Sequence, residues 1–148
     1  MSLKEQLTAD MKEAMKNKEK ERLAVIRMVR GAIRQQEIDG QKELGEEDVI
    51  AVISKEVKMR RDSIEEFQKG GREDLVEKTQ AEIDVLMPYL PAQLSEAEVR
   101  ELVKAAVEQT GAATPKDMGK VMGVLMPKVK GRADGKMVNT IVKSFLQG

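Results

Sequence analysis

The chain has 148 residues with 26 basic and 26 acidic side chains, so its formal net charge is zero. It contains no histidine and no cysteine, which removes the commonest general base, the usual zinc ligands and all thiolate and disulfide chemistry. With only two Phe and one Tyr, the core must be built from Leu, Ile, Val, Ala and Met, which are mostly good helix formers, and we expect an all-α protein.

Four amphipathic helices are predicted in the first 90 residues, because apolar residues recur there at spacings of three and four. They cover about residues 3–17, 19–39, 46–69 and 73–87. Ser2 and Glu5 form a candidate capping box before the first helix, and Gly70 and Gly71 separate the last two. The turns between these helices are short, so we expect two helical hairpins that pack together.

A break in helical geometry is expected at Met87–Pro91, because Pro88 and Pro91 lack backbone donors and restrict the residues before them. We place a domain boundary here. The prediction is an N-terminal helical domain over residues 1–90 and a C-terminal three-helix domain over residues 91–148.

Three helices are predicted after this boundary. A capping box at Ser95–Glu98 opens the first, and Gly111 can end it as a left-handed cap. Thr114–Pro115 opens the second, which Pro127 is expected to stop. Asp134 can cap the last helix. A methionine at every fourth position of the second helix (Met118, Met122 and Met126) indicates core packing.

Positive charge is concentrated at the C-terminal end. Residues 111–148 carry seven basic and two acidic side chains, a net charge of +5, so the other 110 residues carry −5. Such an asymmetry indicates an anionic partner. The residues expected to contact phosphates are Lys120, Lys128, Lys130, Arg132 and Lys136. A solvated or inter-lobe electrostatic surface is the alternative explanation.

Glycines accompany these cations. Gly119 and Gly123 lie one turn apart in the second predicted helix, and Gly131 lies between Lys130 and Arg132. All three are candidate sites for the close approach of another backbone. Small residues one turn apart either let a neighbouring helix approach closely or let an RNA backbone come near the helix. Both alternatives stay open at this point.

A stripe of three arginines on the predicted helix 19–39 shares one face, since Arg27, Arg30 and Arg34 are spaced by three and four. Paired with acids from adjacent helices, these arginines are structural. Otherwise they extend a nucleic-acid surface onto the N-terminal domain.

No catalytic site is evident. Ser54, Ser63 and Ser144 lie in predicted helix interiors, and no nucleophile elbow, phosphate loop or dinucleotide fingerprint is present. We therefore expect no cofactor and no metal. The N-terminus carries charges where a signal peptide would be apolar, and no apolar run approaches the length of a membrane span. These features favour a cytoplasmic location.

Three motifs resemble the YqeY-like family: YLPAQLS at 89–95, DMGKVMG at 117–123 and KGRADGKMVN at 130–139. The resemblance implies an all-helical protein whose C-terminal lobe is similar to the tail domain of the B subunit of the glutamine-dependent Asp/Glu-tRNA amidotransferase, a domain thought to contact tRNA. The family association with carbon–nitrogen ligase activity, with glutamine as amido-N-donor, is implied by that similarity alone. The tail motif falls on Gly119, Lys120, Met122, Gly123, Lys130, Gly131 and Arg132.

The leading hypothesis is an accessory protein that binds tRNA or tRNA-like RNA through the basic C-terminal lobe. The alternative is a non-catalytic adaptor that docks on an amidotransferase, an aminoacyl-tRNA synthetase or another enzyme. An active amidotransferase component ranks last, because the sequence offers no catalytic residues for it.

Overall fold

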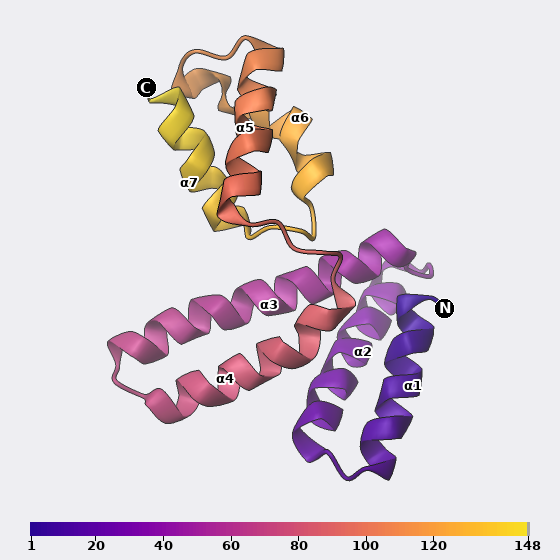
Figure 1. Ribbon diagram of the computed structural model, residues 1–148. Coiled ribbons are helices and arrows are strands. Elements are labelled where there is room, and N and C mark those ends of the chain that lie inside the picture. The colour runs from indigo at the N-terminus through magenta and orange to yellow at the C-terminus, as the bar shows by residue number, and fades with distance from the viewer. Residues whose placement is uncertain (148) are drawn as a thin grey trace. The chain divides into compact units, whose positions relative to one another are not determined.

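The computed structural model describes residues 1–147 and contains seven α-helices, with no β-strand among the described residues (Figure 1). The prediction of an all-α protein is confirmed. The chain divides into two compact units, one of residues Met1–Leu90 and one that begins at Pro91, called here the N-terminal and C-terminal lobes. None of the described helices combines the length and the apolar character needed to cross a membrane.

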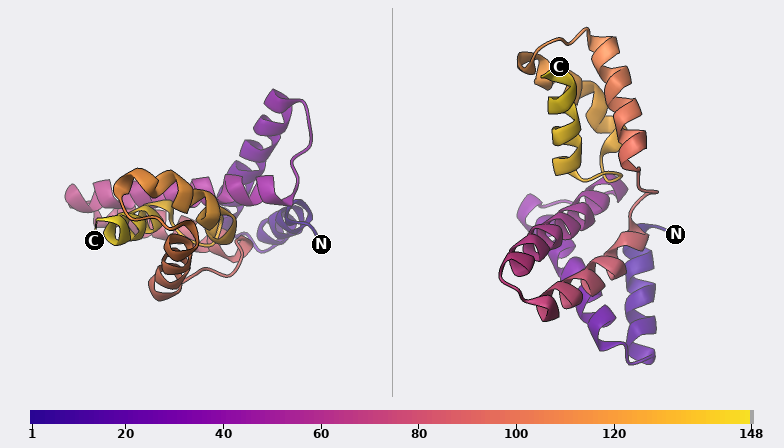
Figure 2. Two further views of the ribbon diagram at one scale, coloured as in Figure 1. Left: turned by 90° about the horizontal axis from the view of Figure 1, so that it is seen from above. Right: turned by 60° about the vertical axis from the view of Figure 1, so that its left-hand side comes forward.

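The N-terminal lobe consists of two helical hairpins (Figures 1 and 2). Helix α1 (Leu3–Lys16) pairs with α2 (Lys20–Gly40), and α3 (Glu46–Lys69) pairs with α4 (Glu73–Leu86). Each bound lies within one residue of its predicted position. The hairpins share one core, to which every helix contributes fully buried side chains; these include Leu7, Ile26, Val29, Val49, Ile53 and Leu86.

A single 3₁₀ turn, η1 (Met87–Tyr89), follows α4, so α-helical geometry ends at Leu86, close to the predicted break. Tyr89 is buried, and its hydroxyl donates a hydrogen bond to Asp10 of α1. Burial, and then the adjacent Asp10 carboxylate, raise the pKa of Tyr89. This contact attaches the end of the N-terminal lobe to its first helix.

The C-terminal lobe packs α5 (Glu96–Thr110), α6 (Met118–Val129) and α7 (Gly135–Leu146) around a core that includes Val99, Val103, Val121, Leu125, Ile141 and Val142. The predicted capping box is confirmed: Ser95 Oγ accepts the Glu98 amide at 3.1 Å, and the Ser95 amide donates to Glu98 Oε1 at 3.0 Å. Gly111 ends α5 with φ +68°, as expected.

Two predictions for α6 are wrong. Pro127 does not stop the helix, which runs on to Val129. Proline removes the single bond to residue 123, but later amides can still donate, and the Lys130 amide bonds the Met126 carbonyl at 2.9 Å. Met126 is not core but 44% exposed. A spacing of four advances about 40° per step around a helix, so a third methionine rotates off the buried face on which Met118 packs.

Candidate nucleic-acid interface

One face of α6 is open. Gly119 and Gly123 lie on the side away from the buried Val121 and Leu125, and both are exposed. No described atom lies within 4 Å of where a Cβ would stand at either glycine. Within the described part of the C-terminal lobe, therefore, no neighbouring helix packs against these glycines, and the α6 backbone is open here.

Two lysines border this open face at the start of α6. Lys120 lies within about 100° of Gly119 around the helix axis, and Lys116 belongs to the short 3₁₀ turn η2 (Pro115–Asp117) just before it. The Lys120 side chain is 73% exposed, with Nζ 3.9 Å from Asp117 Oδ1. The candidate site thus gains an exposed positive charge with one weak ion pair.

Asp117 is a structural group of this turn. Its Oδ2 accepts the amides of Ala113 at 3.0 Å and Thr114 at 3.3 Å. These backbone bonds, more than the charge of Lys120, lower the pKa of Asp117. The aspartate therefore stays ionised and offsets one of the two neighbouring lysines.

Lys128 and Lys130 lie at the other end of α6. Lys128 is in its last turn and Lys130 is the residue at its C-terminal cap; both are exposed. Lys128 lies about 140° around the axis from Gly123, so it is outside the open glycine face. Lys130 follows on the same side as the glycines. Both charges also interact favourably with the C-terminal end of the helix dipole.

The loop between α6 and α7 is bonded to the segment that precedes α5. Gly131 adopts φ +73°, and its carbonyl accepts Gln93 Nε2 at 2.9 Å. Arg132 Nε donates to the Ala92 carbonyl at 3.2 Å, and the Arg132 carbonyl accepts the Leu94 amide at 2.8 Å. Gly131 is thus required by the turn, and Arg132, which is partly buried, has a structural role in addition to any contact with phosphate.

The N-terminus of α7 already has a negative group. Asp134 is its N-cap, and Oδ1 accepts the Lys136 amide at 3.4 Å, a long hydrogen bond. The predicted cap is confirmed. Because a carboxylate stands where a phosphate would bind the helix end, this terminus is a poor anion site. Lys136 is exposed in the first turn of α7.

The structure therefore brings together only part of the predicted site. Gly119, Gly123, Lys120 and Lys130 share one side of α6, whereas Lys128 and Lys136 do not. Sequence reasoning missed Lys116 as a member of this surface, although it was counted in the basic C-terminal segment. It also missed Gln93, whose only signal was its place in the YLPAQLS motif.

Known proteins similar to this chain match it over nearly its whole length. The family model described as "Yqey-like protein" matches residues 4–146. A relative from Pyrenophora tritici-repentis named "Altered inheritance of mitochondria protein 41, mitochondrial" is 39% identical over 130 residues, covering 86% of this chain and 71% of the relative. Proteins of the same name from Lachancea thermotolerans and Saccharomyces cerevisiae are 36% and 32% identical, covering 94% of this chain and 79% and 80% of their own lengths.

The prediction of a cytoplasmic location is contradicted by these names, which describe mitochondrial proteins. The reasoning failed because charges at the N-terminus and the lack of a long apolar run argue only against a secretory signal peptide and a membrane span, and do not distinguish the cytoplasm from the mitochondrion. The names mention neither RNA nor a reaction, so the expected RNA contacts and partner enzymes stay predictions.

Proposed function

The chain belongs to the YqeY-like protein family, and we propose that this member binds structured RNA of the tRNA type through the open face of α6. The observation that carries the proposal is the absence of any described atom within 4 Å of a Cβ built at Gly119 or Gly123. Exposed lysines border both ends of the same face. Resemblance of this lobe to the amidotransferase tail domain favours tRNA as the RNA class.

The chemistry of the face suits an RNA backbone better than its bases. Without side chains at Gly119 and Gly123, a sugar–phosphate strand can approach the helix, while lysines supply charge at the edges. Phe145, the one aromatic residue of this lobe, packs against the core and is partly buried, so it offers little surface for base stacking. Recognition should therefore depend on shape and charge, with modest sequence preference.

Salt dependence gives the first quantitative test. If the lobe neutralises three to five phosphates, affinity should fall on the order of 10²-fold between 50 and 200 mM salt. Fluorescence anisotropy of labelled tRNA, titrated with the full chain at several salt concentrations, measures this. No binding at 50 mM salt, or an affinity independent of salt, would overturn the proposal.

A charge-neutral variant locates the site. Lys120→Gln/Lys130→Gln should reduce the slope of log K against log salt by about 1.4, if each lysine contacts one phosphate of a single strand. Arg132 is left intact because it holds the loop to Ala92. Lys104→Gln/Lys143→Gln, which removes two exposed charges from α5 and α7, is the matched control. Equal slopes for the two variants would argue against the α6 face.

A second candidate function is a protein adaptor, which a groove in the N-terminal lobe favours. The groove measures about 920 Å³, and Ala24, Val25 and Met28 of α2 with Val85 of α4 form apolar parts of its lining. The groove is also lined by Lys18, Lys20 and Lys78 and by three glutamates, of which Glu19 and Glu82 form ion pairs with Arg22 and Arg60. The excess of lysines over the remaining glutamate would make an acidic amphipathic helix of a partner enzyme, such as an amidotransferase or an aminoacyl-tRNA synthetase, complementary.

A pull-down with and without ribonuclease separates the two functions. An adaptor keeps its partner after RNA is removed and loses it when the groove is altered by Met28→Glu. A partner that ribonuclease releases instead supports the RNA proposal.

A further inference from the structure

The outer face of α2 carries positive charge and no acid. With about 100° per residue, seven residues fall within an arc of about 100°; they are Lys20, Leu23, Arg27, Arg30, Gly31, Arg34 and Ile38. Four of the seven are cations. The acids Glu21 and Asp39 lie outside this arc, about 80° beyond Gly31 at its edge.

The nearest acid to this arc is already neutralised. Glu37 borders it, but its Oε2 forms an ion pair with Lys4 of α1 and accepts the Leu44 amide at 2.9 Å. The hydrogen bond from Lys4, followed by that from the Leu44 amide, lowers the pKa of Glu37. The negative charge of Glu37 is therefore neutralised by Lys4, and it does not balance the arginines.

The arginines of this face are not used in ion pairs. Arg27 and Arg34 are exposed, and the described structure contains no salt bridge for either. Arg30 Nη1 instead contacts Met11 Sδ of α1 at 2.8 Å. The expectation that acids of adjacent helices pair with this stripe is therefore wrong.

Arg22, on the other side of the same hairpin, differs from these arginines because it forms several ion pairs. Arg22 Nη1 lies 2.8 Å from Glu19 and 3.7 Å from Glu13, and its Nη2 lies 3.8 Å from Asp10. These acids raise the pKa of Arg22, with the hydrogen bond to Glu19 contributing most. Arg27 and Arg34 have no comparable set of partners.

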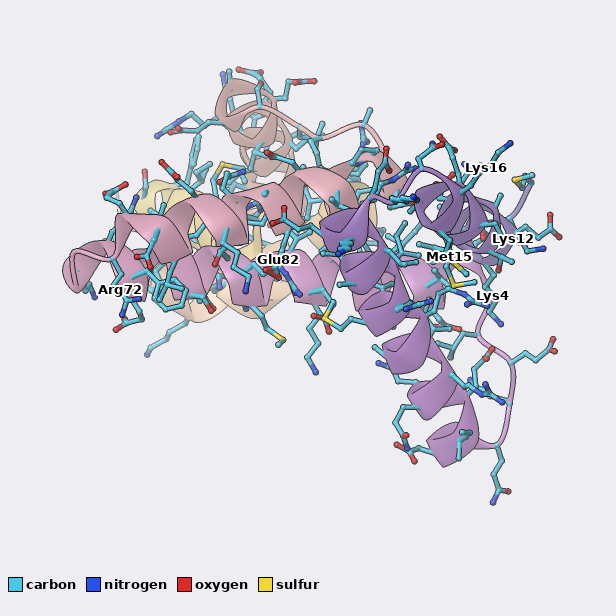
Figure 3. All side chains as sticks on the ribbon, turned by 90° about the horizontal axis from the view of Figure 1, so that it is seen from below. Lys4, Lys12, Met15, Lys16, Arg72 and Glu82 are labelled. Atoms are coloured by element: carbon cyan, nitrogen blue, oxygen red, sulfur yellow. The ribbon has the colours of Figure 1, made fainter. Side chains whose placement is uncertain are left out.

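Helix α1 carries two further exposed lysines. Lys12 and Lys16 are exposed, and no ion pair of either is described. Figure 3 shows both projecting from the α1 ribbon, with Met15 and Lys4 on the same helix beside α2. Glu5 is the one acid of α1 at a similar angle. The outward-facing parts of α1 and α2 thus carry six cations for which no ion pair is described: Lys12, Lys16, Lys20, Arg27, Arg30 and Arg34.

We propose that this arginine face, defined by Arg27, Arg30 and Arg34, is a second phosphate-binding surface for the same RNA. Guanidinium groups pair with phosphate oxygens in a planar, bidentate geometry, which lysines do not provide. Arg27 and Arg34 are separated by seven residues, about 10 Å along the helix, so they reach different phosphates. Gly31 lies at the edge of the face, and no described atom is within 4 Å of a Cβ built there.

The net negative charge of the chain before residue 111 does not oppose this. At 0.1 M salt, charges separated by more than about 10 Å are largely screened. A bound strand therefore responds to the local excess of cations on the hairpin and not to acids on distant helices. The proposal rests on the proposed RNA-binding function but places a contact outside the C-terminal lobe.

The test is an Arg27→Gln/Arg34→Gln variant of the full chain. Glutamine has nearly the helix propensity of arginine, so the fold should be kept, and far-ultraviolet circular dichroism checks this. Loss of two phosphate contacts should reduce the salt slope of tRNA binding by about 1.4 to 1.8 and the affinity at 0.1 M salt by about 25- to 60-fold. Arg27→Lys/Arg34→Lys keeps the charge and should keep most of the slope.

The matched control is Lys55→Gln/Lys58→Gln, which removes two exposed charges from α3. If the arginine variant behaves like this control while Lys120→Gln/Lys130→Gln weakens binding, the second surface is overturned and the proposed function stands. If instead the arginine variant weakens binding while Lys120→Gln/Lys130→Gln behaves like the control, the arginine face is supported and the α6 site is refuted. Absence of tRNA binding by the unaltered chain at 50 mM salt overturns both.

Discussion

Gly123 lies in the middle of α6, exposed, with no described atom within 4 Å of where its Cβ would stand. Glycine in a helix interior is about 0.8–1.0 kcal/mol less favourable than alanine. Gly123→Ala should therefore stabilise α6 by about that amount, since the added methyl group meets nothing. If the glycine instead served close helix packing, the same substitution would destabilise the lobe.

Amide hydrogen exchange of the full chain measures this change locally, which avoids treating a protein with two lobes as a single two-state unit. The buried positions Val121 and Leu125 report on α6. Their amides should exchange about four to five times more slowly in Gly123→Ala. Ala105→Gly, at an exposed position within α5, is the control and should accelerate exchange in that helix by a similar factor.

The same variant also tests function. A methyl group on the open face keeps the strand farther from the helix, so tRNA binding should weaken although the protein is more stable. Faster exchange at Leu125 would refute the structural reasoning. Slower exchange with unchanged tRNA affinity would leave the fold correct and show that the glycine face does not contact RNA.

Three further predictions concern the interactions that hold the fold. Leu125→Ala should destabilise the C-terminal lobe by about 2–5 kcal/mol through loss of core packing, as measured by urea denaturation; a smaller effect would show that the core is less tightly packed than described. The Ser95 amide lowers the pKa of Glu98 from its usual value, so the ionised cap stabilises α5 at neutral pH and this contribution is lost as the pH falls through the lowered pKa; Glu98→Gln should flatten the acid dependence of exchange in α5, and an unaltered profile would contradict the cap. Tyr89→Phe should lower stability by about 1.5 kcal/mol because Asp10 loses a donor. The raised pKa of Tyr89 means that wild-type stability should decline as the pH rises above about 10, and a thermal melt series in which Tyr89→Phe declines equally would exclude that cause.

Much of the fold could be predicted because its signals are local. Apolar periodicity and glycine breaks located α3 at Glu46–Lys69, the same bounds that the structure shows. The capping box at Ser95–Glu98 needs only four consecutive residues. The family, too, could be identified from short motifs, and the match over residues 4–146 confirms it.

Residue type and charge located the candidate site only coarsely. They selected the basic C-terminal segment but grouped Lys128 with Lys130, although α6 turns them to different sides. They gave Gly119, Gly123 and Gly131 one role, whereas the first two are open to solvent and the third makes a turn.

The positions of the helices follow from the order of the residues alone, since hydrogen bonds and caps within a helix join residues three or four apart. Which helix faces stay uncovered, and which cations are already engaged, depend on how the helices pack. The contacts of Arg132 with Ala92 and Leu94 span about 40 positions of the chain, and the isolation of Arg27 and Arg34 depends on the helices around them. Such arrangements exist only after the helices have packed, because packing selects one neighbour for each face from many that the pattern allows.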